Sequence, residues 1–365
     1  MYGNKDYEMI LPGSYVFSIL LLVLTLLCWG SWANLFKLAG KWRFELFYLD
    51  FAVGVGIAAI VAALTFGSLG WDGFGFTDNL QMAGRRQDLY AFLAGCVFNL
   101  ANLLLLAAVS VAGMSVAFPV VMGLGLVVAT IWSLFGVAGG SPLLLSAGCV
   151  AIVAACVFDA LAHREYTIKK LAKAPPPEPS PAAKSKGARV NPKRGFTYKA
   201  ILLSVAGGLV MGSFYPLLDL ARNGENGLGP YAGGFVFAIG VGFSTFVFNL
   251  FFMNLPVQGK PIEISEYFKG KVKQHAAGLV GGMVWYAGAV SSFVVARADG
   301  PATVTPAVMV PLTQSAALVA ALWGLLAWHE YAGAENKVKT YIAAMFFLLV
   351  VGVGIISVAP LFSGS

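Results

Sequence analysis

Ten apolar stretches of about 20 residues each follow one another along this chain and limit what it can fold into. An apolar helix of that length spans the hydrocarbon core of a bilayer, which is about 30 Å thick. A helix also satisfies its own backbone hydrogen bonds, as a lipid environment requires. The sequence therefore predicts an all-α membrane protein whose ten transmembrane helices cover residues 15–36, 47–69, 89–109, 113–135, 142–162, 199–220, 231–254, 276–297, 303–327 and 340–361.

The composition agrees with a membrane protein and gives no sign of an enzyme. Charged residues make up 11% of the chain, whereas soluble proteins carry about 25%. All 4 cysteines lie in apolar stretches, where they are interpreted as small buried side chains. The sequence has no phosphate loop, no G-x-S-x-G motif and no metal-ligand spacing. We therefore expect no catalytic residues, no cofactor and no metal.

A basic segment between the fifth and sixth stretches indicates the orientation. Residues 163–198 are rich in proline, alanine and lysine and have few apolar side chains, so we expect a linker of low order. Lysine and arginine gather on the cytoplasmic side of membrane proteins. This places the linker in the cytoplasm and, by parity, both termini outside a plasma (inner) membrane. The other inner loops then hold nine lysines and arginines, and the outer segments hold five.

The net charge of +7 is interpreted as topology and contact with anionic membrane lipids rather than nucleic-acid binding. Within the inner loops, residues 263–275 combine apolar residues with lysines. That mixture predicts a helix lying along the membrane surface.

The two halves of the chain repeat each other. "FAVGVG" at 51–56 returns as "FAIGVG" at 237–242, "GCVF" at 95–98 aligns with "GMVW" at 282–285, and "PVVM" at 119–122 aligns with "PAVM" at 306–309. With a small slip, "WGSW" at 29–32 aligns with "MGSF" at 211–214. Each half holds five spans, and an odd number inverts the second copy. We predict two inverted five-helix repeats, 1–162 and 199–365, joined by the linker 163–198, an architecture of secondary transporters.

Short motifs resemble the ureide permease family of the drug/metabolite transporter superfamily, which includes sugar-uptake and rhamnose-transporter branches. The similar segments are "WGSW" at 29–32, "FYLDF" at 47–51, "NLP" at 254–256 and "LWGLLAWHEY" at 322–331. The resemblance implies proton-driven import (symport) of oxo-heterocycles such as allantoin, or of nucleobases such as uracil. Plant members of this family carry a Walker-A-like segment in a longer central loop, which this linker lacks.

Polar and aromatic residues inside the spans are candidates for a substrate site, because such groups are costly in a bilayer. Tryptophan rings can stack on a planar heterocycle, and amide side chains can pair with its lactam edge. Alternatively, the tryptophans form an interfacial belt and the asparagines bridge helices. We expect one midplane cavity between the halves, built from Trp29, Trp32, Asn34, Asn99, Asn102, Tyr215, Trp285, Tyr286, Thr313 and Gln314.

Acidic residues are candidates for proton coupling. Asp50 lies in the segment similar to the family's Y-L-D-Y motif and is the first choice, and Asp219 is the reserve. Asp50 could instead begin a helix, and Asp219 could pair with Arg222. For Asp159 we expect a helix-end or interhelical role, and for Glu330 a solvated position at a span end.

These observations favour a secondary importer of a small, polar, planar metabolite. A monosaccharide transporter of the same fold, an exporter and a membrane receptor without transport are the alternatives.

Overall fold

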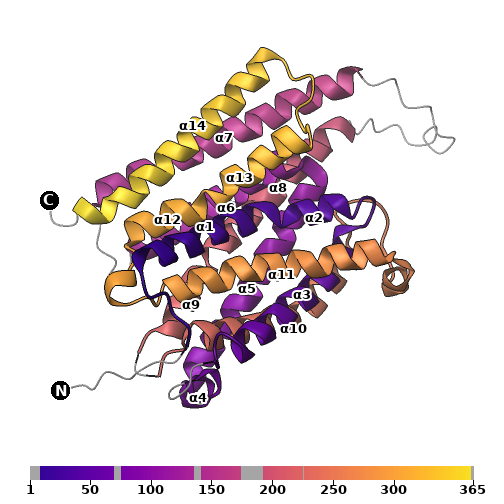
Figure 1. Cartoon of the computed structure of the whole chain (residues 1–365). Helices are drawn as coiled ribbons and strands as arrows, with labels where there is room; N and C mark the ends of the chain where they lie inside the picture. Colours follow the sequence, from indigo (N-terminus) through magenta and orange to yellow (C-terminus); the bar gives the residue numbers. More distant parts are fainter. Residues whose placement is uncertain (1–8, 70–74, 135–140, 174–191, 225, 363–365) are drawn as a thin grey trace.

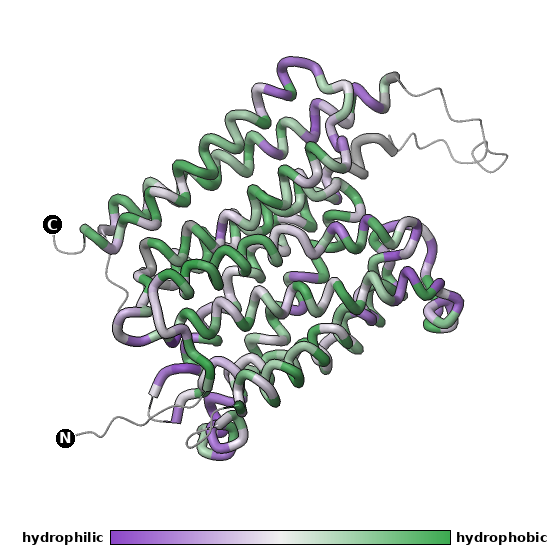
Figure 2. The backbone as a smooth tube through the Cα atoms, in the orientation of Figure 1, coloured by the Kyte–Doolittle hydropathy of each residue, from purple (hydrophilic) through white to green (hydrophobic). Residues whose placement is uncertain are grey.

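The computed structural model describes residues 9–69, 75–134, 141–173, 192–224 and 226–362. Every regular element within these residues is a helix, and ten helices are long and apolar enough to cross a membrane. The ten predicted spans are therefore confirmed as helices. Figure 1 shows them side by side in one bundle. Figure 2 shows hydrophobic residues in the middle of the bundle and hydrophilic ones at its ends, as a bilayer requires.

The described residues up to Lys173 form seven helices: α1 (Tyr15–Ser31), α2 (Ala33–Leu38), α3 (Phe44–Leu64), α4 (Phe76–Met82), α5 (Arg85–Ala112), α6 (Met114–Leu134) and α7 (Pro142–Lys173). The described residues after Lys173 form α8 (Pro192–Gly212), α9 (Phe214–Arg222), α10 (Pro230–Asn254), η2 (Ile264–Lys269), α11 (Val272–Val295), η3 (Gly300–Ala302), α12 (Pro306–Gln314), α13 (Ala316–Leu322), η4 (Trp323–Ala327), α14 (Asn336–Val358) and η5 (Ala359–Phe362).

The two ends of the bundle are distinguished by the helices that start and stop there. At one end α1 begins and η5 finishes, and we call it the terminal end (Figure 1). At the opposite end α7 finishes and α8 begins, and we call it the linker end (Figure 1).

The structure corrects the extent of the linker. Helix α7 continues to Lys173, through residues that the composition had assigned to a linker of low order. Its extension is supported by contacts with α14 and the segment before it: the Tyr166 hydroxyl donates to the Ala332 carbonyl, and Glu165 pairs with Lys337 of α14. The rest of the predicted linker up to residue 191 lies outside the described residues, and α8 begins at Pro192.

The surface helix predicted over residues 263–275 is wrong in extent. Only Ile264–Lys269 form a short helix, and α11 begins at Val272 and includes His275. Gly270 separates the two elements in a crowded place, where a Cβ would come within 2.6 Å of the Trp42 ring and 2.4 Å of His275 Nε2.

Helix packing follows a regular exchange between the halves. Helix α3 packs on α11, and α5 packs on α10; α1 packs on α11, and α8 packs on α5; α1 packs on α13, and α8 packs on α6. Within each of these three sets, replacing every helix by the corresponding helix of the other half converts the first pair into the second. Helices α7 and α14, which correspond to each other, pack together. The inverted repeat remains a prediction, and this packing is the arrangement it produces.

Glycines at equivalent positions bring these helices into close contact. A Cβ on Gly54 of α3 would come within 2.0 Å of the Leu279 carbonyl oxygen on α11. A Cβ on its counterpart Gly240 of α10 would come within 2.2 Å of the Phe92 carbonyl oxygen on α5. The repeated "FAVGVG" and "FAIGVG" segments therefore form two equivalent helix crossings, which only glycine permits at this separation.

Candidate functional site

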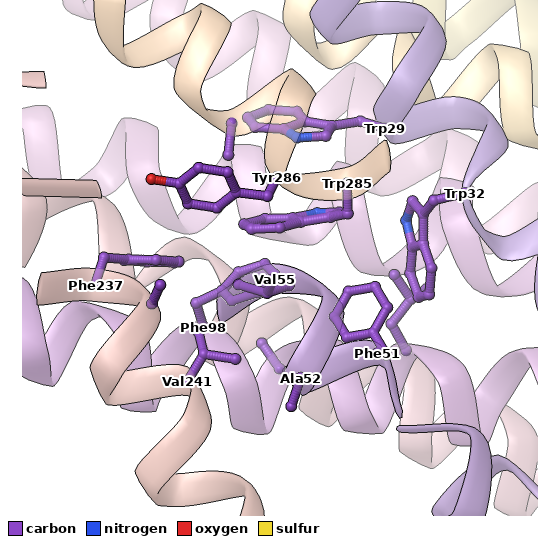
Figure 3. Close-up of a cluster of buried hydrophobic side chains, with 14 of the residues drawn as sticks. Trp29, Trp32, Phe51, Ala52, Val55, Phe98, Phe237, Val241, Trp285 and Tyr286 are labelled. Carbon is purple, nitrogen blue, oxygen red and sulfur yellow. The ribbon is translucent and has the colours of Figure 1, made fainter. Parts of the chain in front are cut away.

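Three aromatic rings stack around Trp285 in the interior of the bundle (Figure 3). Phe98 of α5 lies with its ring centroid 4.2 Å from that of Trp285 and its plane tilted by 28°. Trp29 of α1 lies at 6.2 Å and 11°, and Phe237 of α10 at 6.1 Å and 14°. All four rings are buried. The stack thus joins helices from before and after the linker.

Small residues allow the rings to approach. Gly288 lies nearly one helical turn beyond Trp285 on α11. A Cβ there would come within 2.9 Å of Trp29 Cδ1 and of Cys28 Cβ. A larger side chain at position 288 would therefore push Trp29 away from Trp285.

A small cavity lies beside the stack. Its volume is about 30 Å³, which is room for about one or two water molecules. Sites for drug-sized ligands measure roughly 300–1,000 Å³, so a heterocycle can enter only when the rings move apart. The cavity is lined by Trp29, Trp32, Phe98, Asn102, Leu105, Phe118, Met122, Met211, Phe214, Tyr215 and Trp285.

Polar groups are few around this cavity. The Asn102 amide nitrogen donates to the Tyr48 hydroxyl at 3.1 Å, and both side chains are buried. The Tyr215 hydroxyl hydrogen-bonds the side chain of Gln314, so Gln314 supports a lining residue without being one itself. The buried Nε1 of Trp29 has no hydrogen-bond partner among the described residues. A ligand acceptor placed beside Trp29 would satisfy that donor.

Other predicted site residues lie elsewhere, for reasons of helix geometry. Asn34 accepts from Trp328 Nε1 at 2.6 Å, outside the cavity. It is two residues from Trp32, about 200° around the helix, so the two cannot face the same way. Asn99 is turned towards α10, where it donates to Ser244 and Thr245 at 2.9 and 3.1 Å. This is the helix-bridging role that was the alternative.

Two further predicted residues also lie outside the cavity. The Tyr286 hydroxyl points away from Trp285 in Figure 3 and lies against Gly234, where a Cβ would be 2.6 Å from it. The Thr313 hydroxyl donates to the Met309 carbonyl of its own helix at 3.0 Å.

Asp50 is buried at the junction of α3, η2 and α11. The Tyr267 hydroxyl donates to its Oδ1 at 2.5 Å, and His275 Nδ1 lies 2.9 Å from its Oδ2. Burial and the Asp50 carboxylate raise the pKa of Tyr267 to about 12, so this hydroxyl keeps its proton at neutral pH. The His275 side chain is 29% exposed and that of Asp50 only 7%. The imidazole therefore connects a buried carboxyl group with water.

The reserve candidate, Asp219, has a different environment. Its side chain is 60% exposed and pairs with Arg222 on the same helix, as the alternative interpretation proposed. An exposed ion pair of this kind lacks the burial that proton coupling requires. The structure gives no support to a coupling role for Asp219.

The sequence did not reveal several residues that the structure places around the candidate sites. Phe98 lies in an apolar run without any polar marker, and Tyr267 and His275 are distant from Asp50 in sequence. Glu330 was expected to be solvated, but its side chain is only 10% exposed and pairs with Lys37. The Glu-Tyr ending of the 322–331 segment was the one available signal for it.

The chain has a distant sequence likeness to a plant permease. No family model matches the chain. "Ureide permease 1" of Arabidopsis thaliana is 22% identical over 382 residues, covering 93% of this chain and 96% of the relative. A solved structure titled "Crystal structure of protein" has a TM-score of 0.49 at 14% identity, covering 94% of this chain and 96% of that one. The chain is an integral, multi-pass membrane protein, and its distant likeness is to a permease rather than an enzyme.

Proposed function

We propose that this protein is a secondary transporter that imports a small, planar, polar heterocycle, a ureide such as allantoin or a nucleobase such as uracil, together with protons. The observation that carries the proposal is the pair of nearly parallel indole rings, Trp29 and Trp285, that borders the cavity. A planar ring between them needs about 3.5 Å on each face, or about 7 Å in all. Their centroids are 6.2 Å apart, so an opening of about 1 Å or more would admit it.

The polar groups near these rings fit the edge of such a ligand. The Asn102 amide offers both a donor and an acceptor, which match the carbonyl and N–H groups of a urea or lactam. The Trp29 indole N–H is an additional donor without a protein partner in the described part of the chain. A monosaccharide would require partners for many hydroxyl groups, and this lining provides few, so the heterocycle is favoured over the sugar.

Asp50 provides the proposed route for protons. It lies next to Phe51, whose ring packs on Trp32 at 4.8 Å and on Trp285 at 6.4 Å. Its Cβ also lies against Gly278, seven residues before Trp285 on α11, and a Cβ on that glycine would come within 2.5 Å of it. A shift of α3 against α11 when Asp50 changes charge would therefore reach the aromatic stack. We also propose that the linker end faces the cytoplasm.

A thermal-shift screen on the purified protein tests the ligand class. A ligand that binds only the native state raises the unfolding temperature, increasingly so with concentration. Allantoin, uracil, glucose and rhamnose are compared, and we expect stabilisation by one or more of the heterocycles and by neither sugar. Stabilisation by the sugars alone would overturn the assignment.

A further inference from the structure

Glu330 is the centre of a half-buried junction at the linker end, between three parts of the fold. Its Oε1 accepts from Lys37 Nζ of α2 at 2.7 Å and from the Met114 N–H at 2.8 Å, and its Oε2 accepts from the Ser115 N–H at 2.8 Å. Met114 and Ser115 begin α6, where a negative charge is favourable. Gly113 makes room with φ 92°, since a Cβ there would be 2.5 Å from the carboxyl carbon. We call these contacts the Glu330 junction.

Asp159 of α7 lies within electrostatic reach of this junction but has no partner of its own. It is fully buried, and neither carboxyl oxygen has a hydrogen-bond partner among the described residues. It interacts electrostatically with Glu330 and with Tyr331. The Tyr331 hydroxyl and the Nε2 of His163, just over one turn further along α7, are likewise buried and unpartnered in the part of the chain described. Three buried polar groups that interact electrostatically with Glu330 therefore lack a hydrogen-bond partner among the described residues.

No nearby cation compensates Asp159 among the described residues. Helix α7 packs against α14, α6 and α8, and the sequence of α6 contains no titratable residue. Lys337 of α14 pairs with Glu165, Lys199 of α8 donates to the Val257 carbonyl, and Lys37 is bound by Glu330. The remaining titratable groups near this region include Cys156, His163, Tyr166, Tyr331 and Tyr341.

A carboxylate enclosed in this way is unstable as an anion. Burial removes its hydration, no donor replaces the lost water, and the nearby Glu330 carboxylate repels a second negative charge. Glu330 differs from Asp159 in that Lys37 and two backbone N–H groups bind it. Burial without a donor or a cation favours the neutral, protonated form of a carboxyl group.

We infer that Asp159 is a second proton-binding group and that loss of its proton loosens the Glu330 junction. Deprotonation would place two carboxylates close together, and the repulsion would weaken the contact of Glu330 with the start of α6. Opening of the linker end would in turn admit water to Asp159 and favour loss of the proton. The place of this step in transport rests on the proposed function, whereas the proton site and its coupling to the junction do not.

Infrared spectroscopy of the full-length protein tests the protonation directly. A protonated carboxyl group has its own carbonyl stretching band, which shifts in D₂O. We expect such a band at neutral pH to be lost in Asp159→Asn and kept in Asp219→Asn, which alters an exposed carboxylate in the same way. A spectrum without this loss in Asp159→Asn would overturn the proposal.

Hydrogen exchange tests the coupling to the junction, because the Met114 and Ser115 amides donate directly to Glu330. Each variant is compared with the wild type at the same pH, which cancels the intrinsic pH dependence of exchange. As pH rises above neutral, we expect these amides to exchange on the order of tenfold faster in the wild type than in Asp159→Asn. Glu330→Gln should exchange fast at every pH. Equal exchange in wild type and Asp159→Asn at all pH values would refute the coupling. Neither measurement uses a substrate, so both stand even if no uptake is found.

Discussion

Trp29 and Trp285 face each other with their ring planes 11° apart, across helices α1 and α11. Both line the interior cavity, and Phe98 covers the other side of Trp285 at 4.2 Å. One side of Trp285 is thus supported by protein, while the other faces a ring that a ligand can displace. This asymmetry suggests that Trp29 moves when a substrate enters and Trp285 stays in place.

Replacing Trp29 with alanine should weaken heterocycle binding by roughly five- to 150-fold, because stacking of an aromatic side chain on a base contributes about 1–3 kcal/mol. Binding is measured by calorimetry on purified protein, and Trp29→Phe should retain much of the affinity. Trp132→Ala serves as the control, since this tryptophan is 52% exposed and outside the cavity. Equal losses for Trp29→Ala and Trp132→Ala would exclude the stacking role.

Alanine substitutions in the repeated hexapeptides should distinguish the glycines at helix contacts from the glycines that have no neighbouring atom, by their effect on stability. Gly54→Ala and Gly240→Ala each place a Cβ against a carbonyl of the neighbouring helix, and should destabilise the protein by about 1–3 kcal/mol. Gly56 and Gly242, two residues further along, have no atom within 4 Å of an added Cβ. Their alanine variants should be neutral or slightly stabilising. Thermal unfolding compares the four, and similar unfolding temperatures for all would contradict the close crossings.

Asp50→Asn should abolish accumulation driven by a pH gradient while leaving binding and substrate exchange largely intact. Asparagine keeps the size of the side chain and can still accept from Tyr267, but it cannot lose and regain a proton. Accumulation and counterflow are measured in proteoliposomes, with Asp219→Asn as the exposed control. Accumulation by Asp50→Asn that follows the imposed gradient would remove Asp50 from coupling.

Cysteine labelling should place the two ends of the bundle on opposite sides of the membrane. Ser265 of η2 and Thr77 of α4 are both exposed and lie at the linker and terminal ends respectively (Figure 1). In intact cells, an impermeant reagent should label Thr77→Cys and should label Ser265→Cys only after permeabilisation. The wild type measures the background from its own cysteines. The opposite labelling pattern would reverse the proposed orientation.

Span positions were predictable because the length and apolarity of a transmembrane helix are local properties. The contact glycines were also predictable from the sequence, because a close helix crossing in each half requires the same glycine-containing segment in both. Helix extension beyond the membrane was harder to predict. Residues 163–173 are polar, and the contacts of Tyr166 and Glu165 that support them involve residues far along the chain.

The site was predictable only in part. Trp29 and Trp32 are three residues apart and share a face, and both line the cavity. Asn99 and Asn102 have the same spacing, but Asn99 faces α10 whereas Asn102 lines the cavity. The sequence does not show where the contact with a neighbouring helix falls on such a face. Partners distant in sequence, such as Asp50 with His275 and Glu330 with Lys37, follow from the tertiary packing alone.

The most direct test of the central claim is uptake of labelled allantoin and uracil into proteoliposomes under an imposed pH gradient. We expect at least one of them to accumulate above equilibrium, to be released when a protonophore collapses the gradient, and to be displaced by unlabelled heterocycle. Glucose and rhamnose should not compete. Uptake that is unaffected by the gradient, or that only the sugars compete for, would contradict the proposed transport of a planar heterocycle with protons.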